Sequence, residues 1–194
     1  SGTGIIDGVN GTFGPAAAGA GTHTITYTIA GSCGDTDTET ITVNPSMDAT
    51  ITPVGSMCVN DAPVTMTSVD GGGTWSGTGM TGADFDPAAA GAGTHTVVYE
   101  ITGACGDIDS VDVVVTPQLD ATITPNGPFC DDDPIQAMNA VDGGGTWSAT
   151  CGGCIDSGTG SFDPTTAGVG TYTVYYDIPG SCGDVDSTTI TVNN

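Results

Sequence analysis

The sequence predicts an all-β fold made of tandem immunoglobulin-like β-sandwich repeats. The first observation is an alternation of apolar and polar residues in short runs, as in GTYTVYYDI at 170–178, which is typical of a half-buried strand. The second is the clustering of Gly, Pro, Asp and Ser between these runs, where turns are expected. The third is the return of the whole pattern after 72 residues, and after 77 in the last copy.

The repeated segments define three copies of one unit. GTHTITYTI at 21–29 returns as GTHTVVYEI at 93–101 and as GTYTVYYDI at 170–178, and each run is followed by a Cys-Gly-Asp turn. Segments DATITP and GGGTW precede these runs in the second and third copies only. We therefore predict three parts, called the first, middle and last copies below: the C-terminal half of a repeat at 1–45, a complete repeat at 46–117, and a complete repeat with a CxxC insertion at 118–194.

The half-length first copy suggests that the chain is an interior slice of a longer array. The front half of this first repeat is then expected upstream. The joints between copies are short and contain proline, as at Pro117. Such joints favour a semi-rigid rod over freely jointed beads. No helix is expected, because glycine interrupts the Ala-rich stretches PAAAGAG.

Composition excludes several classes of function. The chain of 194 residues carries 23 acidic residues and no Lys or Arg, for a net charge of −23. It therefore has no cations for nucleic acid or for an anionic membrane surface. Without Lys or Arg there is no Schiff base, no P-loop and no bidentate anion clamp. No nucleophile–base pair is recognisable either, so no enzyme is expected, and no stretch is apolar enough for membrane insertion.

The seven cysteines follow the repeat. Cys58 and Cys130 stand early in the two complete copies, and Cys105 and Cys182 stand in their late turns. We predict the pairs Cys58–Cys105 and Cys130–Cys182, with Cys33 pairing upstream of the segment. Such bonds would indicate an oxidising, extracellular setting.

Cys151 and Cys154 in the insertion are predicted to form a local disulfide. Redox chemistry of the thioredoxin type needs a CxxC motif at a helix N-terminus, and this one lies in a Gly-rich β insertion. A zinc site would need two further ligands, and none is spare.

The acidic turns are the strongest candidates for a metal site. Spaced carboxylates follow each late-turn cysteine, at Asp35, Asp37, Asp107, Asp109, Asp184 and Asp186. Ca²⁺ takes six to eight oxygen ligands, so it is the one cofactor for which the sequence offers a ligand set. The alternative is that these residues stabilise turns through backbone hydrogen bonds and keep the surface soluble.

The only histidines, His23 and His95, occupy the position of Tyr172 in the repeat. A position that accepts either His or Tyr is interpreted as a packing position near the edge of the sandwich. Catalysis or metal binding there is not expected.

The succession C…GGGTWSGTG…FDPAAAGAGTHTVVYEITGACGDIDSVDVVV resembles the repeat units of very large Bacteroidota cell-surface proteins, among them gliding-motility adhesins exported by type IX secretion. The resemblance covers essentially the whole chain. It implies an extracellular location at the cell surface, attachment to surfaces or polysaccharide, and a motility or secretion complex in the envelope as partner. It also implies O-glycosylation at Asp-Ser motifs, with Ser110 and Ser187 as candidates. The absence of Lys and Arg departs from the family and suggests a saline or calcium-rich habitat.

Three functional hypotheses follow. The leading one is a non-catalytic stalk within a long surface adhesin, in contact with neighbouring repeats of the same chain. The second is the protomer of a self-assembling extracellular filament. The third is a Ca²⁺-dependent carbohydrate-binding module that uses exposed aromatic residues such as Tyr175.

Overall fold

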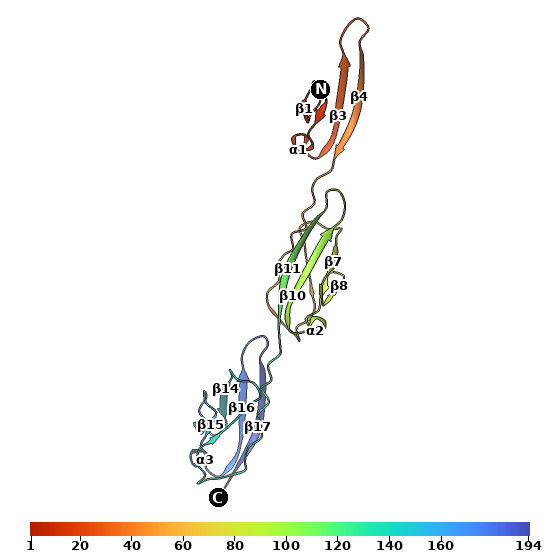
Figure 1. Cartoon of the computed structure of the whole chain (residues 1–194). Coiled ribbons are helices and arrows are strands. Elements are labelled where there is room, and N and C mark those ends of the chain that lie inside the picture. The colour runs from red at the N-terminus through yellow and green to blue at the C-terminus, as the bar shows by residue number, and fades with distance from the viewer. The chain divides into compact units, whose positions relative to one another are not determined.

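The computed structural model describes all 194 residues (Figure 1). Strands contain 45% of the residues and helices 6%, which confirms the predicted all-β class. The chain divides into two compact units. The first comprises Ser1–Thr52, Thr67–Ser76 and Val98–Val111, and the second comprises Pro53–Met66, Gly77–Val97 and Asp112–Asn194. The division into three copies stays a prediction, and the copies serve below as landmarks in the sequence.

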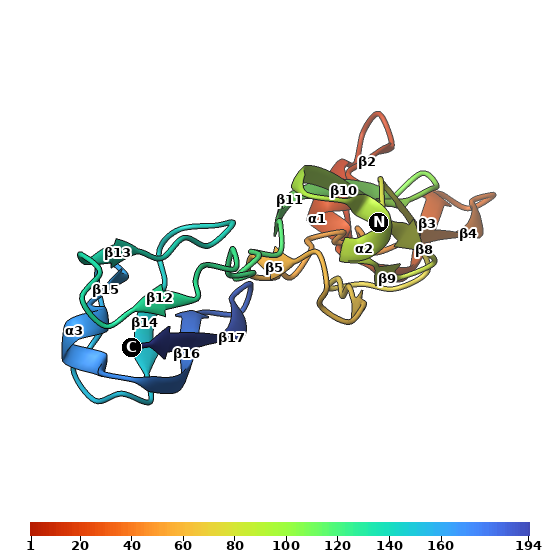
Figure 2. The ribbon, with the colours of Figure 1, turned by 90° about the horizontal axis from the view of Figure 1, so that it is seen from below.

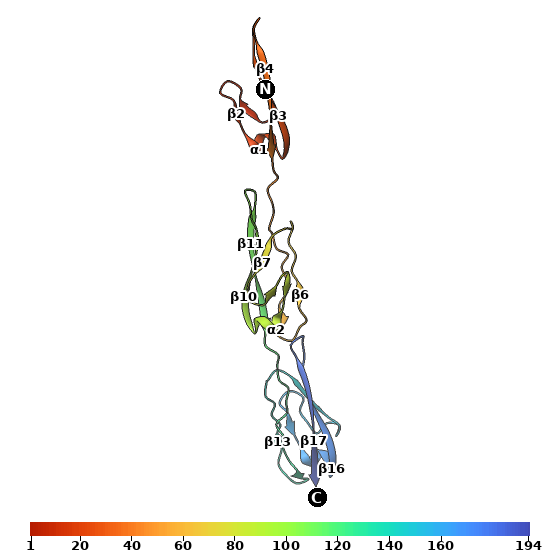
Figure 3. The same ribbon diagram turned by 90° about the vertical axis from the view of Figure 1, so that its right-hand side faces the viewer.

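The first copy consists of a long hairpin and a small two-stranded sheet. Its elements are β1 (Ile5–Asp7), β2 (Thr12–Phe13), α1 (Pro15–Ala18), β3 (Gly21–Ile29) and β4 (Asp35–Val43). Strands β3 and β4 pair antiparallel from Gly21–Val43 to Ile29–Asp35. In Figure 3 the loop end of this hairpin extends away from β2 and α1.

The middle copy contains a four-stranded sheet in the order β5-β11-β10-β7 and a three-stranded sheet in the order β6-β9-β8. Its elements are β5 (Met57–Cys58), β6 (Val64–Thr65), β7 (Thr74–Ser76), β8 (Met80–Thr81), β9 (Asp84–Phe85), α2 (Pro87–Ala90), β10 (Gly93–Ile101) and β11 (Asp107–Thr116). Strand β5 runs parallel to the end of β11.

The last copy repeats this arrangement, with a four-stranded sheet in the order β12-β17-β16-β14 and a two-stranded sheet β13-β15 (Figure 2). Its elements are β12 (Phe129–Cys130), β13 (Gln136–Ala137), β14 (Thr146–Ala149), β15 (Ser161–Phe162), α3 (Pro164–Ala167), β16 (Gly170–Ile178) and β17 (Asp184–Asn193). Strand β12 runs parallel to the end of β17.

The alternation read from the sequence matches the burial of the strands. In β16, Val174, Tyr176 and Ile178 are buried, whereas Tyr175 and Asp177 between them are exposed. The core of the last copy gathers these inward residues with apolar residues from both sheets. Its buried members are Ala121, Ile123, Phe129, Met138, Trp147, Cys154, Phe162, Val174, Tyr176, Ile178, Ile190 and Val192.

The expectation of no helix was wrong, because each copy contains one helical turn in the PAAA or PTTA segment. Pro164 occupies the first turn of α3, where its fixed φ suits the helix and its missing N–H is not needed. Asp163 caps the turn by accepting hydrogen bonds from the N–H groups of Thr165 and Thr166. Gly168, at a φ of 74°, ends it. These local signals suffice for one turn without any helical periodicity.

Candidate functional site

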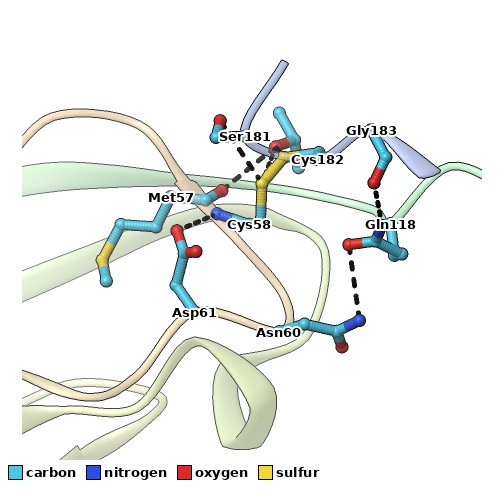
Figure 4. The surroundings of a disulfide bond; sticks show 9 residues. Met57, Cys58, Asn60, Asp61, Gln118, Ser181, Cys182 and Gly183 are labelled. Carbon is cyan, nitrogen blue, oxygen red and sulfur yellow. Dashed lines mark hydrogen bonds between the residues drawn. A yellow bond between two sulfur atoms is a disulfide. The ribbon is translucent and has the colours of Figure 1, made fainter. Parts of the chain in front are cut away.

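A disulfide between Cys58 and Cys182 joins the middle copy to the last copy (Figure 4). The two Cα atoms lie 5.4 Å apart, and the bond spans 124 positions of the sequence. Cys58 is only 1% exposed, so its half of the bond is shielded from solvent. We call this disulfide and the residues that contact it the joint.

Cys58 reaches the joint on β5. Met57 and Cys58 pair in parallel with Val115 and Thr116 at the end of β11. The Cys58 N–H donates to Asp61 Oδ2 at 2.7 Å, and this bond closes the loop after the cysteine. We call the last strand of each complete copy, β11 or β17, its closing strand. The early cysteine therefore lies beside the C-terminal end of the closing strand of its copy.

Cys182 reaches the joint in the turn between β16 and β17. Its carbonyl accepts a hydrogen bond from the N–H of Leu119 at 3.0 Å. The neighbouring Gly183 carbonyl accepts from the Gln118 amide at 2.6 Å. The late turn of the last copy is thus bonded to the segment through which the chain enters that copy.

The predicted pairs Cys58–Cys105 and Cys130–Cys182 were both wrong. In the last copy, Cys130 lies beside Asn193, at one end of β17, and Cys182 precedes Asp184, at the other. Ten extended residues separate these ends by about 30 Å, whereas a disulfide needs Cα atoms within about 7 Å. The early and late cysteines of one copy therefore cannot meet, and Cys58 pairs with the late turn of the next copy.

The local disulfide Cys151–Cys154 is confirmed, with its Cα atoms 5.7 Å apart. Cys154 is buried in the core of the last copy, so this bond anchors the insertion to the sandwich. Three cysteines are free, namely Cys33, Cys105 and Cys130. The upstream partner predicted for Cys33 stays a prediction.

Four of the six aspartates predicted as Ca²⁺ ligands bind backbone N–H groups of the DATI segments. Asp184 and Asp186 accept from Ala121 and Ile123 at 3.0 and 2.8 Å. In the middle copy, Asp107 and Asp109 accept from Ala49 and Ile51 at 2.9 and 2.8 Å. The four residues that donate these N–H groups are buried, and a buried N–H group needs a hydrogen-bond partner. The aspartate carboxylates supply it. This is the structural role that the sequence left open as the alternative to Ca²⁺ binding.

In the first copy, Asp35 and Asp37 have no such segment to bind. The Asp35 carboxylate accepts only from the N–H of its neighbour, Thr36. Both residues are exposed. Binding of Ca²⁺ by any of the six aspartates stays a prediction.

The first aspartate of each DATI segment, Asp48 or Asp120, is held by hydrogen bonds of its own. Asp120 accepts a hydrogen bond from the Thr122 N–H at 2.9 Å and donates its own N–H to Asp142 at 2.8 Å. The hydrogen bonds from Thr122 hold the pKa of Asp120 below its ordinary value. Hydrogen bonds from Thr50 lower the pKa of Asp48 in the same way. Both carboxylates are therefore stabilised as anions.

A second acidic group lies at Cys130, where the ligand atoms of Cys130, Asp132 and Asp133 come within 4.8 Å of one another. Asp133 already accepts the Cys130 N–H at 2.7 Å. Asp61 makes the same bond to Cys58 in the middle copy. The proximity of Asp133 to the cysteine thus belongs to the loop structure shared by both copies.

The histidine position fastens the strand to the preceding turn. His23 and His95 donate from Nε2 to the carbonyls of Gly19 and Gly91, at 2.9 and 2.8 Å. Tyr172 donates its hydroxyl to the carbonyls of Ala167 and Gly168. Both residue types therefore make the same side-chain to backbone bond, which explains why they exchange at this position.

The remaining candidates lie on outward faces. Ser110 on β11 and Ser187 on β17 are exposed, and their glycosylation stays a prediction. Tyr175 is also exposed.

Sequence reasoning did not identify the residues that surround the joint. Thr116 places its hydroxyl 2.7 Å from the Cys182 sulfur, and Ser181 places its hydroxyl 3.6 Å from the Cys58 sulfur. Asn60 donates to the Gln118 side chain at 3.4 Å. The available signal was the position of Cys58 and Cys130 directly before an Asp-containing loop, but it does not indicate which copy supplies the partner.

No protein-family model matches the chain, and no curated protein matches it in sequence. Among solved structures, it is similar to mouse cadherin-23 EC22-24, with 14% identity over 88% of this chain and 73% of that one, at a TM-score of 0.34. Mouse clustered PcdhgC3 EC1-3 matches with 13% identity over 92% and 79% of the two chains, at a TM-score of 0.39. Protocadherin gammaB7 EC3-6 matches with 15% identity over 88% and 57%, at a TM-score of 0.35. None of the helices, at four residues each, is long or apolar enough to cross a membrane.

Proposed function

We propose that this chain is a non-catalytic, structural segment of an extracellular tandem-repeat protein of the adhesion type. In this role the sandwiches act as spacers, and covalent bonds between consecutive copies keep them together under tension. The observation that carries the proposal is the Cys58–Cys182 disulfide, which joins two copies rather than the two sheets of one.

An extracellular location follows from the same chemistry. Structural disulfides persist in oxidising compartments and are rare where cellular thiols are kept reduced. The net charge of −23 with no cationic side chain adds mutual repulsion between copies, which opposes collapse and aggregation.

The finer proposal is a stalk of a Bacteroidota surface adhesin, exported by type IX secretion and active in gliding. Its support is the sequence resemblance of the GTW, FDP and Cys-Gly-Asp elements. Surface polysaccharide and an envelope complex for motility or secretion are the partners this role would require. A filament protomer is the second candidate, favoured by two exposed free cysteines, Cys33 and Cys130, through which chains could be linked.

The structural role is tested by pulling the chain from its two ends in a single-molecule force experiment. Under oxidising conditions the disulfide withholds the 124 positions between Cys58 and Cys182 from extension. Reduction should release about 450 Å of additional chain, at about 3.6 Å per residue. A Cys58→Ser variant should release the same length without reductant.

The matched control is Cys33→Ser, which removes an exposed free cysteine and should leave the extension unchanged. Equal extensions of the unmodified chain with and without reductant would show that the joint bears no load, and would overturn the proposal.

A further inference from the structure

We propose that Cys130 is the first half of a second joint, and that it forms a disulfide with the Cys-Gly-Asp turn of a further repeat of this type. Cys105 is, by the same rule, the second half of a joint with the early cysteine of a preceding repeat. The early and late cysteines of every repeat would then be bonded to the neighbouring repeats and never to each other.

The first support is that Cys130 lies in the same backbone frame as Cys58. Phe129 and Cys130 pair in parallel with Val192 and Asn193, as Met57 and Cys58 pair with Val115 and Thr116. In both copies the strand is two residues long and joins the end of the closing strand. Cys130 is thus placed where Cys58 is placed in its own copy.

The loop after the cysteine is also the same. The Cys130 N–H donates to Asp133 Oδ2 at 2.7 Å, and the Asp133 N–H donates back to the Cys130 carbonyl at 3.1 Å. Cys58 and Asp61 make the same two bonds, at 2.7 and 3.0 Å. The Asp131 N–H binds the Asn193 carbonyl at 2.9 Å, as the Val59 N–H binds the Thr116 carbonyl at 3.0 Å.

The second support is that Cys105 lies in the frame of Cys182. The Cys105 carbonyl accepts from the Met47 N–H at 2.9 Å, and the Cys182 carbonyl accepts from the Leu119 N–H at 3.0 Å. Each turn is closed by the same bond, from Gly106 to Gly103 and from Gly183 to Gly180, both at 3.1 Å. The turn of the middle copy is therefore built to present its cysteine at the entry of its own copy.

The third support is exposure. Cys58 is buried once bonded, whereas Cys130 is exposed and Cys105 is partly exposed. Both free thiols thus belong to residues that solvent and a partner cysteine can reach. Bond formation oxidises the two thiols by two electrons, and the oxidant takes up these electrons together with the two thiol protons. A small-molecule disulfide such as oxidised glutathione fills this role by exchange and leaves as two thiols.

The test extends the full chain by one copy, with residues 118–194 appended after Asn194 and the protein refolded in a glutathione redox buffer. The appended copy carries Pro179→Thr, the residue found at the equivalent position 102, so that its peptide 177–183 differs in mass from the original one. The chain has no Lys or Arg, so it is digested without reduction by a protease that cuts before Asp. The existing joint should appear as peptide 48–60 linked to 177–183, and this product serves as the internal control for folding. The proposal predicts a second product, in which peptide 120–130 is linked to the appended copy of 177–183.

Thiol titration gives an independent reading. The chain has three free cysteines, and the appended copy brings its own CxxC pair plus equivalents of Cys130 and Cys182. Three thiols are expected if the new joint forms, and five if it does not. A Cys130→Ser variant of the extended chain should lose the second product and keep the first.

A folded extended chain with the first product and five thiols would overturn the inference. Pairing of Cys130 with the late-turn cysteine of its own copy would overturn it too. If the chain without the appended copy forms disulfide-linked multimers through Cys130 and Cys33, the same joint forms between two separate chains. The inference extends the proposed function, but this test reads only the pairing of Cys130, so it can fail while the force experiment on Cys58–Cys182 succeeds.

Discussion

Strand β3 of the first copy and strand β16 of the last copy have the same sequence pattern but different surroundings. Tyr27 on β3 is 69% exposed, whereas its equivalent Tyr176 on β16 is 3% exposed. Ile29 and Ile178, at the ends of the two strands, are 54% and 4% exposed. The hairpin therefore forms with little cover beyond its own strand pairing and the backbone bonds between Ser1 and Thr26, while the burial of its apolar face depends on the front half of the repeat.

The segments that cover this face are identifiable in the last copy. The ring of Trp147, from the GGGTW segment, packs against Tyr176 with their centroids 4.4 Å apart. The Tyr176 hydroxyl accepts the Gly145 N–H at 2.8 Å. Ile123, from the DATI segment, belongs to the same buried cluster. The first copy lacks both segments in this sequence.

The largest expected effect comes from the two tyrosines. Tyr176→Ala should destabilise the last copy by about 4 kcal/mol, because it opens a cavity beside Trp147. Tyr27→Ala should change the stability of the first copy by less than about 0.5 kcal/mol, because the ring is exposed. Hydrogen exchange of the β16–β17 and β3–β4 amides measures the two effects separately.

Tyr176→Phe is the control that keeps the ring and removes the acceptor of the Gly145 N–H. Its effect should be the smaller one, about 1 kcal/mol. Equal losses of protection in the two copies from the alanine variants would show that β3 is covered as well as β16.

A smaller effect is expected from the second aspartate of each Cys-Gly-Asp turn. Asp186→Ala should destabilise the last copy by about 2 kcal/mol, because it leaves the buried N–H of Ile123 without a partner. The equivalent Asp37→Ala should be almost neutral, because Asp37 is exposed and its carboxylate accepts no hydrogen bond. Denaturant midpoints and hydrogen exchange measure both.

The same pair of variants separates the structural role from Ca²⁺ binding. Midpoints are compared with and without millimolar Ca²⁺. If Ca²⁺ raises the midpoint of the unmodified chain and Asp186→Ala abolishes this rise, the carboxylate binds the ion in addition to the backbone.

The smallest expected effect concerns pH and the helical caps. Hydrogen bonds from Thr166 and Thr165 hold the pKa of Asp163 below its usual value of 3.8, whereas the first copy has Gly14 at this cap position and no side-chain bond. Because the folded pKa is depressed, the cap contributes its stability above about pH 3.8 and loses it as the pH falls through the lower, folded pKa. Asp163→Ala should therefore lower the midpoint at pH 6 and have less effect at pH 2.5.

Fluorescence of Trp147 in a Trp75→Phe background follows the last copy alone. Asp177→Ala is the control, because Asp177 is exposed and lies on a strand rather than at a cap. A difference for Asp163→Ala that stays constant from pH 6 to pH 2.5 would contradict the ionic contribution of the cap.

The features that could be predicted from the sequence are those fixed by local spacing. Alternation along β16 predicts which of its side chains are buried, because successive residues of a strand point to opposite faces. The exchange of His95 and Tyr172 at one repeat position indicated a structural role. The spacing of Cys151 and Cys154 indicated a local bond.

The partner of Cys58 could not be predicted in the same way. Pairing with Cys105 and pairing with Cys182 both match an early cysteine to a late turn, so the repeat pattern does not distinguish them. The choice is made by the length of the closing strand, which in the last copy places the early and late cysteines at its opposite ends. The helical turns were missed for a different reason, because Asp163 and Pro164 provide a start signal that periodicity does not detect.

The Cys58–Cys182 bond also gives the molecule a second covalent route between these two residues, in addition to the backbone. Any single peptide bond between these two residues can be hydrolysed without separating the N-terminal part from the C-terminal part, because the disulfide still connects them. If Cys130 is bonded to the next repeat in the same manner, the two closed loops overlap. A fibre built in this way would tolerate isolated damage to its backbone and would break only where two routes are severed together.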